Sequence, residues 1–428
     1  MHRLGHMNPT PLFALTGMAV LTSAAFAQQP GADAPARTAD EPKPYAATGA
    51  AASQSGTSPA GAMTLKLMDV LITAYPSVKL EMQHNDNIYS TPNNKTGDRI
   101  LVLTPALRLE TKRAGNTFSL RMSSSISQYQ NNRADNNVMT SLNGLAELDL
   151  ATRLRARLAA DVIDGVDPRG STNNPLSATP DHYRQTQGRV VFSYGAQGAP
   201  GRLDLELGQL RRDYLNNRTT TAASDRVVDD LGATFNWRIG SKTKLLAQVK
   251  HSKVDYALST STLGSVENLF QAGATWEATA KTSGTFQFGM TQKSFDESTR
   301  GSARTTSWTG QIRWSPRTYS HVDVSLNRAP AETSGGVGNF IDRTTTGAKW
   351  THDWSSRFTT ETSASYATDA YQGADRTDNT QTYGVNASYK MRRWLNFGGG
   401  YTRTFRNSDN NNFDYKRNAF MLFLNATL

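Results

Sequence analysis

Histidine is the side chain best suited to acid–base chemistry near neutral pH. Beyond the N-terminal segment the histidines lie far apart, at His84, His182, His251, His321 and His352. Asp255 follows His251 by four residues, a spacing that puts the two more than about 10 Å apart in an extended strand. The sequence contains no HExxH motif, phosphate-binding loop or nucleophile elbow. These observations give no catalytic group, and we expect a protein that is not an enzyme.

Two Asn- and Asp-rich segments, at 131–137 and 407–414, carry residue types that can bind calcium. They lack the regularly spaced carboxylates and the final Glu of a calcium loop. Asn and Asp are also common turn residues. We therefore expect no metal site and no cofactor.

Charged residues that alternate with apolar ones indicate a different chemistry. In the segment 202–208, three leucines fall on one face of a strand, and Asp204 and Glu206 fall on the other. Arg153, Arg155 and Arg157 are expected to form a similar polar row. Glu147 and Asp149 would lie beside this row on the preceding strand, so the arginines either bias a water-filled lumen toward anionic solutes or only brace it. The lumen-lining candidates are Arg108, Arg121, Arg153, Arg155, Arg157, Arg189, Arg238, Arg313, Glu147, Asp149, Asp204 and Glu206.

The alternation recurs from about residue 76 to the last residue, in segments long enough to cross a bilayer as tilted strands. Tight turns such as 114–116 alternate with longer polar loops. Five tryptophans lie next to predicted tight turns and would form an aromatic girdle at one membrane interface. We expect an all-β, antiparallel, up-and-down transmembrane barrel of about eighteen strands, in preference to a soluble β-sandwich or a β-helix. The tryptophans are Trp237, Trp276, Trp314, Trp350 and Trp394.

The N-terminal sequence predicts export. Residues 1–27 resemble a secretory signal peptide, with cleavage after Ala27. Residues 28–63 are rich in Ala, Pro, Gly, Ser and Thr, which predicts a disordered periplasmic linker. Residues 64–74 form a short pre-barrel segment, either helix or strand, and 75–428 form the barrel. We expect the outer membrane of a Gram-negative cell, with both termini in the periplasm.

The chain of 428 residues has no Cys and a formal net charge of +10. A small secreted domain usually needs disulfides, whereas a closed barrel does not. The basic residues are scattered among acidic ones, which argues against nucleic acid as a partner. Membrane lipid and the anionic lipopolysaccharide surface are the expected partners.

The first predicted hairpin carries a more specific pattern. Asn85-Asp86-Asn87-Ile88-Tyr89 follows the first strand, and Thr104-Pro-Ala-Leu107 lies in the second. This hairpin resembles the outer-membrane β-barrel porins of exopolysaccharide biosynthesis operons. The resemblance implies a role in passing secreted polysaccharide, or its assembly machinery, across the outer membrane. It brings no catalytic residues, and it implies a structural role for Asn85, Asp86, Asn87, Ile88 and Tyr89.

From the resemblance we expect a channel for export of extracellular polysaccharide, working by passive conduction. The polymer could be anionic, and periplasmic polysaccharide export proteins are possible partners. A general or small-solute porin and a structural or adhesion barrel need the same wall, so both remain open alternatives.

Overall fold

The computed structural model describes residues 62–67, 70–174, 176–196, 198–279, 281–334 and 337–427. The expected signal peptide, its cleavage site at Ala27 and the linker up to residue 61 lie outside the described residues. Almost all regular structure is β-strand. The strands are β1 (Met63–Leu67), β2 (Val70–Asn85), β3 (Asp98–Arg113), β4 (Asn116–Tyr129), β5 (Asn137–Ala151), β6 (Leu154–Asp167), β7 (Asp181–Tyr194), β8 (Gly201–Tyr214), β9 (Arg226–Arg238), β10 (Thr243–Tyr256), β11 (Ser265–Thr279), β12 (Thr282–Phe295), β13 (Ser302–Arg317), β14 (Ser320–Ala331), β15 (Phe340–Asp353), β16 (Phe358–Gln372), β17 (Arg376–Arg392), β18 (Leu395–Ser408) and β19 (Tyr415–Thr427).

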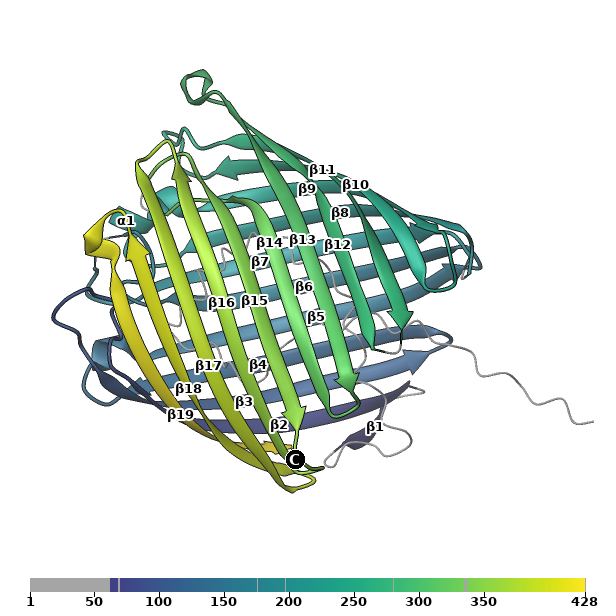
Figure 1. Ribbon diagram of the computed structural model, residues 1–428, viewed down its shortest axis with the longest axis horizontal. Helices are drawn as coiled ribbons and strands as arrows, with labels where there is room; N and C mark the ends of the chain where they lie inside the picture. The colour runs from purple at the N-terminus through teal and green to yellow at the C-terminus, as the bar shows by residue number, and fades with distance from the viewer. Residues whose placement is uncertain are drawn as a thin grey trace, which may run out of the picture.

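Strands β2 to β19 form a closed antiparallel ring. Each strand pairs with the next along the chain, and β19 pairs with β2 to close the barrel. In Figure 1 the yellow and green strands β14–β19 form the near wall, and the blue strands β2–β7 cross behind them. The expected all-β, up-and-down barrel of about eighteen strands is therefore confirmed. Closure leaves no unpaired strand edge within the ring, as a membrane-spanning sheet requires.

The two faces of the wall differ as the alternation predicts. Leu207 lies opposite Leu231 on β9, and both side chains are more than half exposed. Asp204, three residues before Leu207 on the same strand, lies opposite Thr234 on the interior face. Four of the five expected girdle tryptophans are between 42% and 53% exposed, and all five lie close to a short turn. Trp354 also lies in a short turn. The face that carries Leu207, Leu231 and the tryptophans suits contact with lipid, and the face that carries Asp204 suits contact with water.

The two rims of the barrel have different connections. Short turns such as 114–115, 152–153 and 318–319 lie at one rim, which we call the short-turn end. In the first of them, Ala114 and Gly115 adopt φ of +48° and +85°, as a tight hairpin requires. Loops such as 86–97, 168–180 and 332–339 lie at the other rim, the long-loop end. This end also carries α1 (Arg218–Thr221) and the 3-10 helices η1 (Arg133–Asp135), η2 (Ala222–Ser224), η3 (Ser298–Arg300) and η4 (Asn411–Phe413). Among the described residues, no helix is long and apolar enough to cross a membrane.

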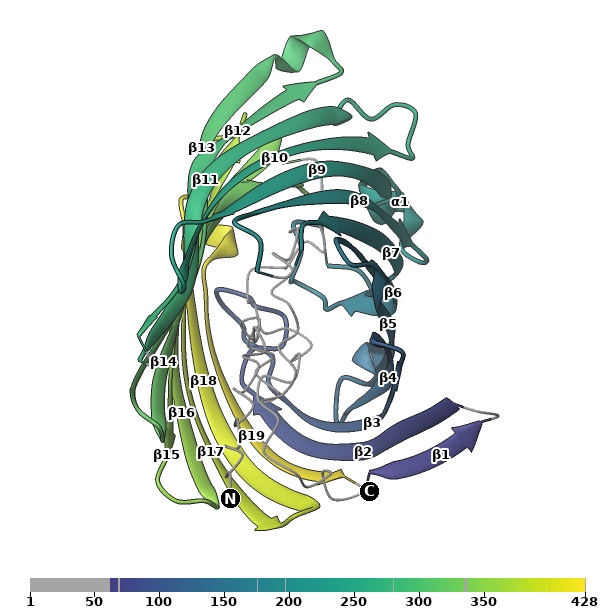
Figure 2. The same cartoon turned by 90° about the vertical axis from the view of Figure 1, so that its right-hand side faces the viewer.

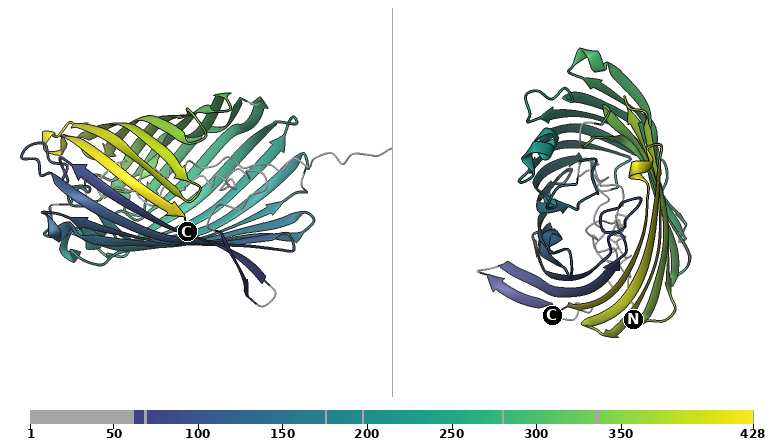
Figure 3. Two further views of the ribbon diagram at one scale, coloured as in Figure 1. Left: turned by 90° about the horizontal axis from the view of Figure 1, so that it is seen from below. Right: turned by 90° about the vertical axis from the view of Figure 1, so that its left-hand side faces the viewer.

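Strand β1 lies outside the ring. It forms a hairpin with the first residues of β2, from Met63 opposite Ala74 to Leu67 opposite Val70. On the same edge of β2, β19 pairs as far as Thr427 opposite Ser77. The first and last described strands therefore meet end to end at the short-turn end, and Figure 3 shows the β1–β2 hairpin projecting from the wall. A helix and a strand were the two possibilities for residues 64–74, and the described residues 64–67 and 70–74 lie in the strands β1 and β2.

The barrel is oval in section. Eighteen strands about 4.8 Å apart and tilted by about 40° would enclose a circle about 36 Å across. Figure 2 instead shows an elongated outline, with connections from the blue part of the chain lying inside it. These inward connections bring residues from distant strands together within the lumen.

Candidate functional site

The interior face of the wall is lined by ion pairs between neighbouring strands. Arg189 lies 3.1 Å from Glu206, and Arg313 lies 2.6 Å from Asp323. Arg108 is paired within its own strand, 2.6 Å from Glu110. Such pairs cross-brace the wall and leave the interior polar.

Three other expected lumen residues lie opposite no side chain of the other charge on the adjacent strands. Arg121 lies directly opposite Arg108, and Arg238 lies directly opposite Lys244. Asp204 accepts hydrogen bonds from Arg202 at 2.8 Å and from Asn236 at 2.9 Å. Like charges that lie directly opposite each other repel, so Arg121 and Arg238 add positive potential near the short-turn end.

The expected row of three arginines is shorter than the sequence suggested. Arg155 lies opposite Asp149, and Arg157 lies opposite Glu147 with 3.7 Å between the charged groups. Arg153 instead lies in the turn 152–153, before β6 begins. Turn residues do not follow strand alternation, so Arg153 is not part of the row on the strand wall.

A charged group that the sequence did not single out lies at the long-loop end. The ammonium of Lys293 contacts Glu267 at 2.7 Å and Glu332 at 2.6 Å, and the Tyr256 hydroxyl also donates to Glu332 at 2.5 Å. Burial alone would raise the pKa of the Glu332 carboxyl, but the Lys293 charge and these hydrogen bonds lower it overall. The Lys293 side chain is almost fully buried. Because Glu332 belongs to a loop, strand alternation could not have placed it here.

The histidines do not form a reactive group. His251 contacts Asn268 at 2.9 Å, and His321 lies 3.5 Å from Asp323, which already binds Arg313. The described residues contain no cluster of His, Asp and Glu with the geometry of a metal site.

The loop between β6 and β7 (residues 168–180, here the crossing loop) is the feature that most changes the lumen. At its start, Arg169 binds Asp135 of η1 through two hydrogen bonds of 2.7 and 2.5 Å. The Tyr89 hydroxyl donates to the same carboxylate at 2.8 Å, and the Arg169 guanidinium lies over the Tyr89 ring. Burial and the Asp135 charge raise the pKa of Tyr89 to about 12. This charged attachment, the near anchor, holds the base of the crossing loop.

Gly170 follows Arg169 and has φ of +78°, which favours glycine. A Cβ at this position would lie 2.0 Å from the carbonyl oxygen of Tyr89. The crossing loop can therefore lie against the 86–97 loop only if this residue has no side chain.

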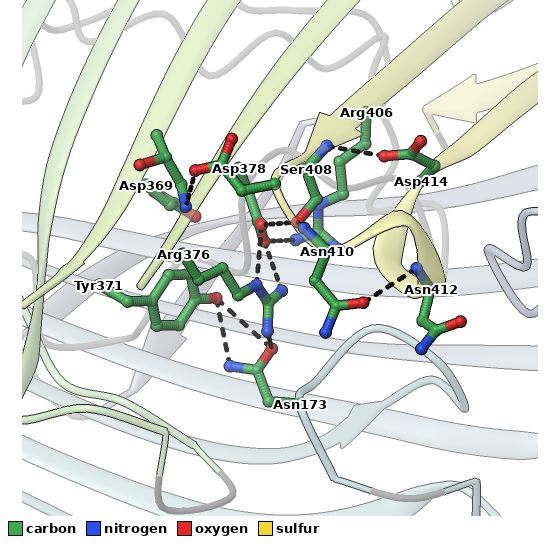
Figure 4. A network of polar contacts seen from close by, with 12 residues as sticks. Asn173, Asp369, Tyr371, Arg376, Asp378, Arg406, Ser408, Asn410, Asn412 and Asp414 are labelled. Atoms are coloured by element: carbon green, nitrogen blue, oxygen red, sulfur yellow. Dashed lines mark hydrogen bonds and ion pairs between the residues drawn. The ribbon is translucent and has the colours of Figure 1, made fainter. Parts of the chain in front are cut away.

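The tip of the crossing loop reaches the opposite wall (Figure 4). The Asn173 carboxamide accepts a hydrogen bond from Arg376 at 3.0 Å and donates one to the Tyr371 hydroxyl at 3.2 Å. The Asn173 backbone N–H donates to Ser334 at 3.3 Å. Arg376 and Tyr371 lie on β17 and β16, eight and nine strands from β7 by the shorter way round the ring. We call this contact the far latch.

Asn173 lies six positions beyond Asp167, the last residue of β6, so the loop tip lies at most about 20 Å from the end of that strand. The loop can bridge the barrel because the section is oval. It divides the mouth of the lumen at the long-loop end and narrows the opening.

The Asn85–Tyr89 motif forms the third part of this arrangement. Asn87 is fully buried and donates hydrogen bonds to the carbonyls of Thr91 and Lys416. Asp86 accepts two hydrogen bonds from Asn418, both at 2.7 Å. Asn85 accepts from the Asn87 N–H at 2.9 Å. The motif fixes the 86–97 loop inside the barrel rim.

Ile88 joins a small apolar core on the interior side of the wall, formed with Ile100, Val102 and Tyr129. Next to it, Tyr89 contributes to the near anchor. The motif therefore positions the surface on which the base of the crossing loop rests.

The family model described as putative beta-barrel porin 2 matches residues 72–428. The chain belongs to this family. Curated protein sequences give no match. Among solved structures, the chain is similar to OccK2 (OpdF) of Pseudomonas aeruginosa, with a TM-score of 0.48, 13% identity, and 83% of this chain and 98% of that chain covered. It is also similar to the FrpB iron transporter of Neisseria meningitidis, with a TM-score of 0.44 and 11% identity. That match covers 78% of this chain and 62% of FrpB.

Membership of this family and the described geometry lead to the same conclusion. The protein is an outer-membrane, porin-like barrel whose wall is cross-braced by ion pairs. The crossing loop spans this lumen at the long-loop end, between Arg169 and Asn173.

Proposed function

We propose that this barrel is a passive outer-membrane channel for small polar solutes. The observation that carries the proposal is the crossing loop, attached at Arg169 on one side and at Asn173 on the other. A loop that bridges the lumen limits the size of what can pass, while the polar interior suits hydrated solutes. No chemical step is needed, so the proposed protein conducts and does not catalyse.

The resemblance of the first hairpin to porins of exopolysaccharide operons favours a second function, export of a secreted polysaccharide. A polymer strand would have to pass beside the crossing loop, or the loop would have to leave the lumen. We favour the small-solute channel because it works with the crossing loop in its observed position.

We further propose that the short-turn end faces the periplasm and the long-loop end faces outside, as is usual for such barrels. The first described strand and β19 would then both end at the periplasmic side. The lipid-facing rows and the tryptophan girdle would contact membrane lipid, with lipopolysaccharide around the long-loop end.

The lumen charges support at most a weak preference among ions. Most interior cations in the described part of the chain have a nearby carboxylate, as Arg189 has Glu206. Arg121 and Arg238, each opposite another cation, are the positions at which we propose a bias toward anions.

Conductance and solute uptake test the proposal together. The purified chain would be placed in planar bilayers, beside a variant in which residues 170–178 are replaced by a short Gly/Ser linker. We expect a channel of modest conductance for the natural chain and a clearly larger one for the variant. Liposome swelling should show a higher size limit for neutral sugars after the loop is shortened. A natural chain that conducts nothing and swells no liposome would refute the channel.

A strain lacking this barrel, and lacking any redundant barrel, separates the two functions. Normal polysaccharide secretion with slower uptake of small solutes would support the proposed function. Loss of secretion with unchanged uptake would instead favour export.

A further inference from the structure

The two attachments of the crossing loop differ in chemistry. The near anchor joins a guanidinium to a carboxylate through two hydrogen bonds, and a tyrosine adds a third. The far latch uses only the neutral carboxamide of Asn173 and a backbone N–H. Hydrogen bonds between two charged groups are stronger than those with one neutral partner. The tip of the loop is therefore the end that can be displaced while the base stays in place.

The Arg376 guanidinium has one terminal nitrogen that Asp378 does not bind. Asp378 accepts from Nε at 2.8 Å and from one terminal nitrogen at 2.5 Å. The other terminal nitrogen donates to Asn173 at 3.0 Å. The carboxamide of the loop thus occupies the one Arg376 donor group that Asp378 does not hold.

Aromatic rings fix the plane of this guanidinium. Its central carbon lies 3.5 Å from the centre of the Phe413 ring and 4.4 Å from the centre of the Tyr371 ring. The Tyr371 hydroxyl lies within hydrogen-bond distance of both polar atoms of the Asn173 carboxamide, at 3.2 and 3.4 Å. A guanidinium donor and a phenol donor converge on one position, which is an arrangement that suits an oxygen acceptor.

The charges near the Asn173 carboxamide also favour an anion over an amide at this position. Asp378 lies 3.6 Å from Arg406 as well, so its negative charge is shared between two guanidiniums. A carboxylate or phosphate oxygen carries more negative charge than a carboxamide oxygen and would form charge-assisted hydrogen bonds. Figure 4 shows Asp378 and Arg406 on the side of the Arg376 guanidinium that faces away from Asn173.

We propose that Arg376 and Tyr371 form a binding site for an oxyanion group of a solute, and that the Asn173 carboxamide occupies this site when the loop is closed. A solute oxyanion replaces Asn173, and the loop tip leaves the far wall while Arg169 keeps the base in place. This inference rests on the proposed channel function, and it names the chemical class of solute that opens the channel. The solute acts by binding the state in which the latch is free.

Single-channel recording of the full purified chain tests the site at constant ionic strength. Acetate and inorganic phosphate are the two oxyanion probes, and glycerol is the neutral control. We expect either oxyanion to increase the population of a higher-conductance state by about tenfold, and glycerol to have no effect. A response to one oxyanion alone would assign the site to a carboxylate or to a phosphate.

Substitutions of Asn173 separate binding from general effects of salt. Asn173→Asp places a carboxylate on the loop itself, so we expect the closed state to persist and the response to acetate to disappear. Asn173→Ala should favour the higher-conductance state without any probe. Asn93→Asp, which adds the same charge at an exposed position of the 86–97 loop, is the matched control and should respond as the natural chain does.

Tyr371→Phe removes the second donor while leaving the Arg376–Asp378 pair intact. It should weaken the conductance response to acetate and phosphate. Heat-modifiable migration on gels verifies that each variant is folded. Channels that conduct normally, yet respond to neither acetate nor phosphate, would overturn the oxyanion site and leave the proposed function standing. A chain that forms no channel would refute the proposed function instead.

Discussion

The barrel wall and the crossing loop hold their charged side chains in different ways. In the wall, a pair such as Arg189 and Glu206 joins adjacent strands that many backbone hydrogen bonds already hold together. The described part of the crossing loop has no sheet partner. Side-chain contacts hold it at Arg169 and Asn173, and Asn217 and Asn216 donate to its carbonyls at 179 and 180. Loss of one wall pair should therefore leave the barrel unchanged, whereas loss of one loop contact should change the opening.

The largest effect is expected from placing a charge on the wrong face of the wall. Leu207→Arg puts a cation on the lipid-facing row near the middle of β8, and we expect a cost of about 2–4 kcal/mol in the free energy of unfolding. Thr234→Arg on the interior face should cost much less. Urea unfolding in lipid vesicles, followed by tryptophan fluorescence, measures both. Equal destabilisation would mean that the two faces are not distinguished by the membrane.

A smaller effect is expected at the near anchor. Asp135→Ala removes the carboxylate that binds both Arg169 and Tyr89. The loop can detach instead of burying an unpaired guanidinium, so the cost is limited to about 1–3 kcal/mol of loop docking. We expect a higher mean conductance and faster proteolytic cleavage within 168–180, with the barrel still folded. A variant with natural conductance would show that the near anchor does not control the opening.

The near anchor should also respond to alkaline pH. The pKa of Tyr89 is raised to about 12 in the folded protein, above the usual value of about 10 for tyrosine. A raised pKa means that the protonated hydroxyl is stabilised, so its contribution is complete below about pH 10 and is lost between about pH 10 and 12. We expect conductance to rise over this range. Tyr89→Phe should remove this step, and an identical pH profile would assign the step to another group.

The wall could be predicted from the sequence because each of its features depends on residues that lie close together in the chain. Alternation in segments such as 202–208 fixes which side chains face lipid, and pairs such as Ala114–Gly115 fix the turns. Closing eighteen strands requires no further information, since each strand pairs with its sequence neighbour and the last pairs with the first. The same reasoning does not extend to Arg153, because Arg153 lies in a turn and strand alternation does not apply there.

The crossing loop could not be predicted in the same way. Asn173 contacts Tyr371, which lies 198 residues further along the chain, and nothing near Asn173 distinguishes it from other loop asparagines. Gly170 is the one local sign, because a left-handed conformation beside another backbone requires glycine. The Asn85–Tyr89 motif was recognised by resemblance, but its role in seating the crossing loop depends on contacts with Asp135 and Arg169 that only the fold brings together.

The smallest expected effect concerns the selectivity of the wall. Arg155 lies opposite Asp149, and Arg157 lies 3.7 Å from Glu147, so acidic neighbours offset part of the positive charge of both. Replacing Arg155 and Arg157 together by Glu places like charges opposite Asp149 and Glu147, and should shift the reversal potential toward cation preference. Arg153→Glu, in the turn at the short-turn end, should shift it less because the charge lies outside the strand wall. Reversal potentials in planar bilayers under a salt gradient measure both. If neither variant changes the reversal potential, these arginines only brace the wall, and the long-loop end alone sets ion selectivity.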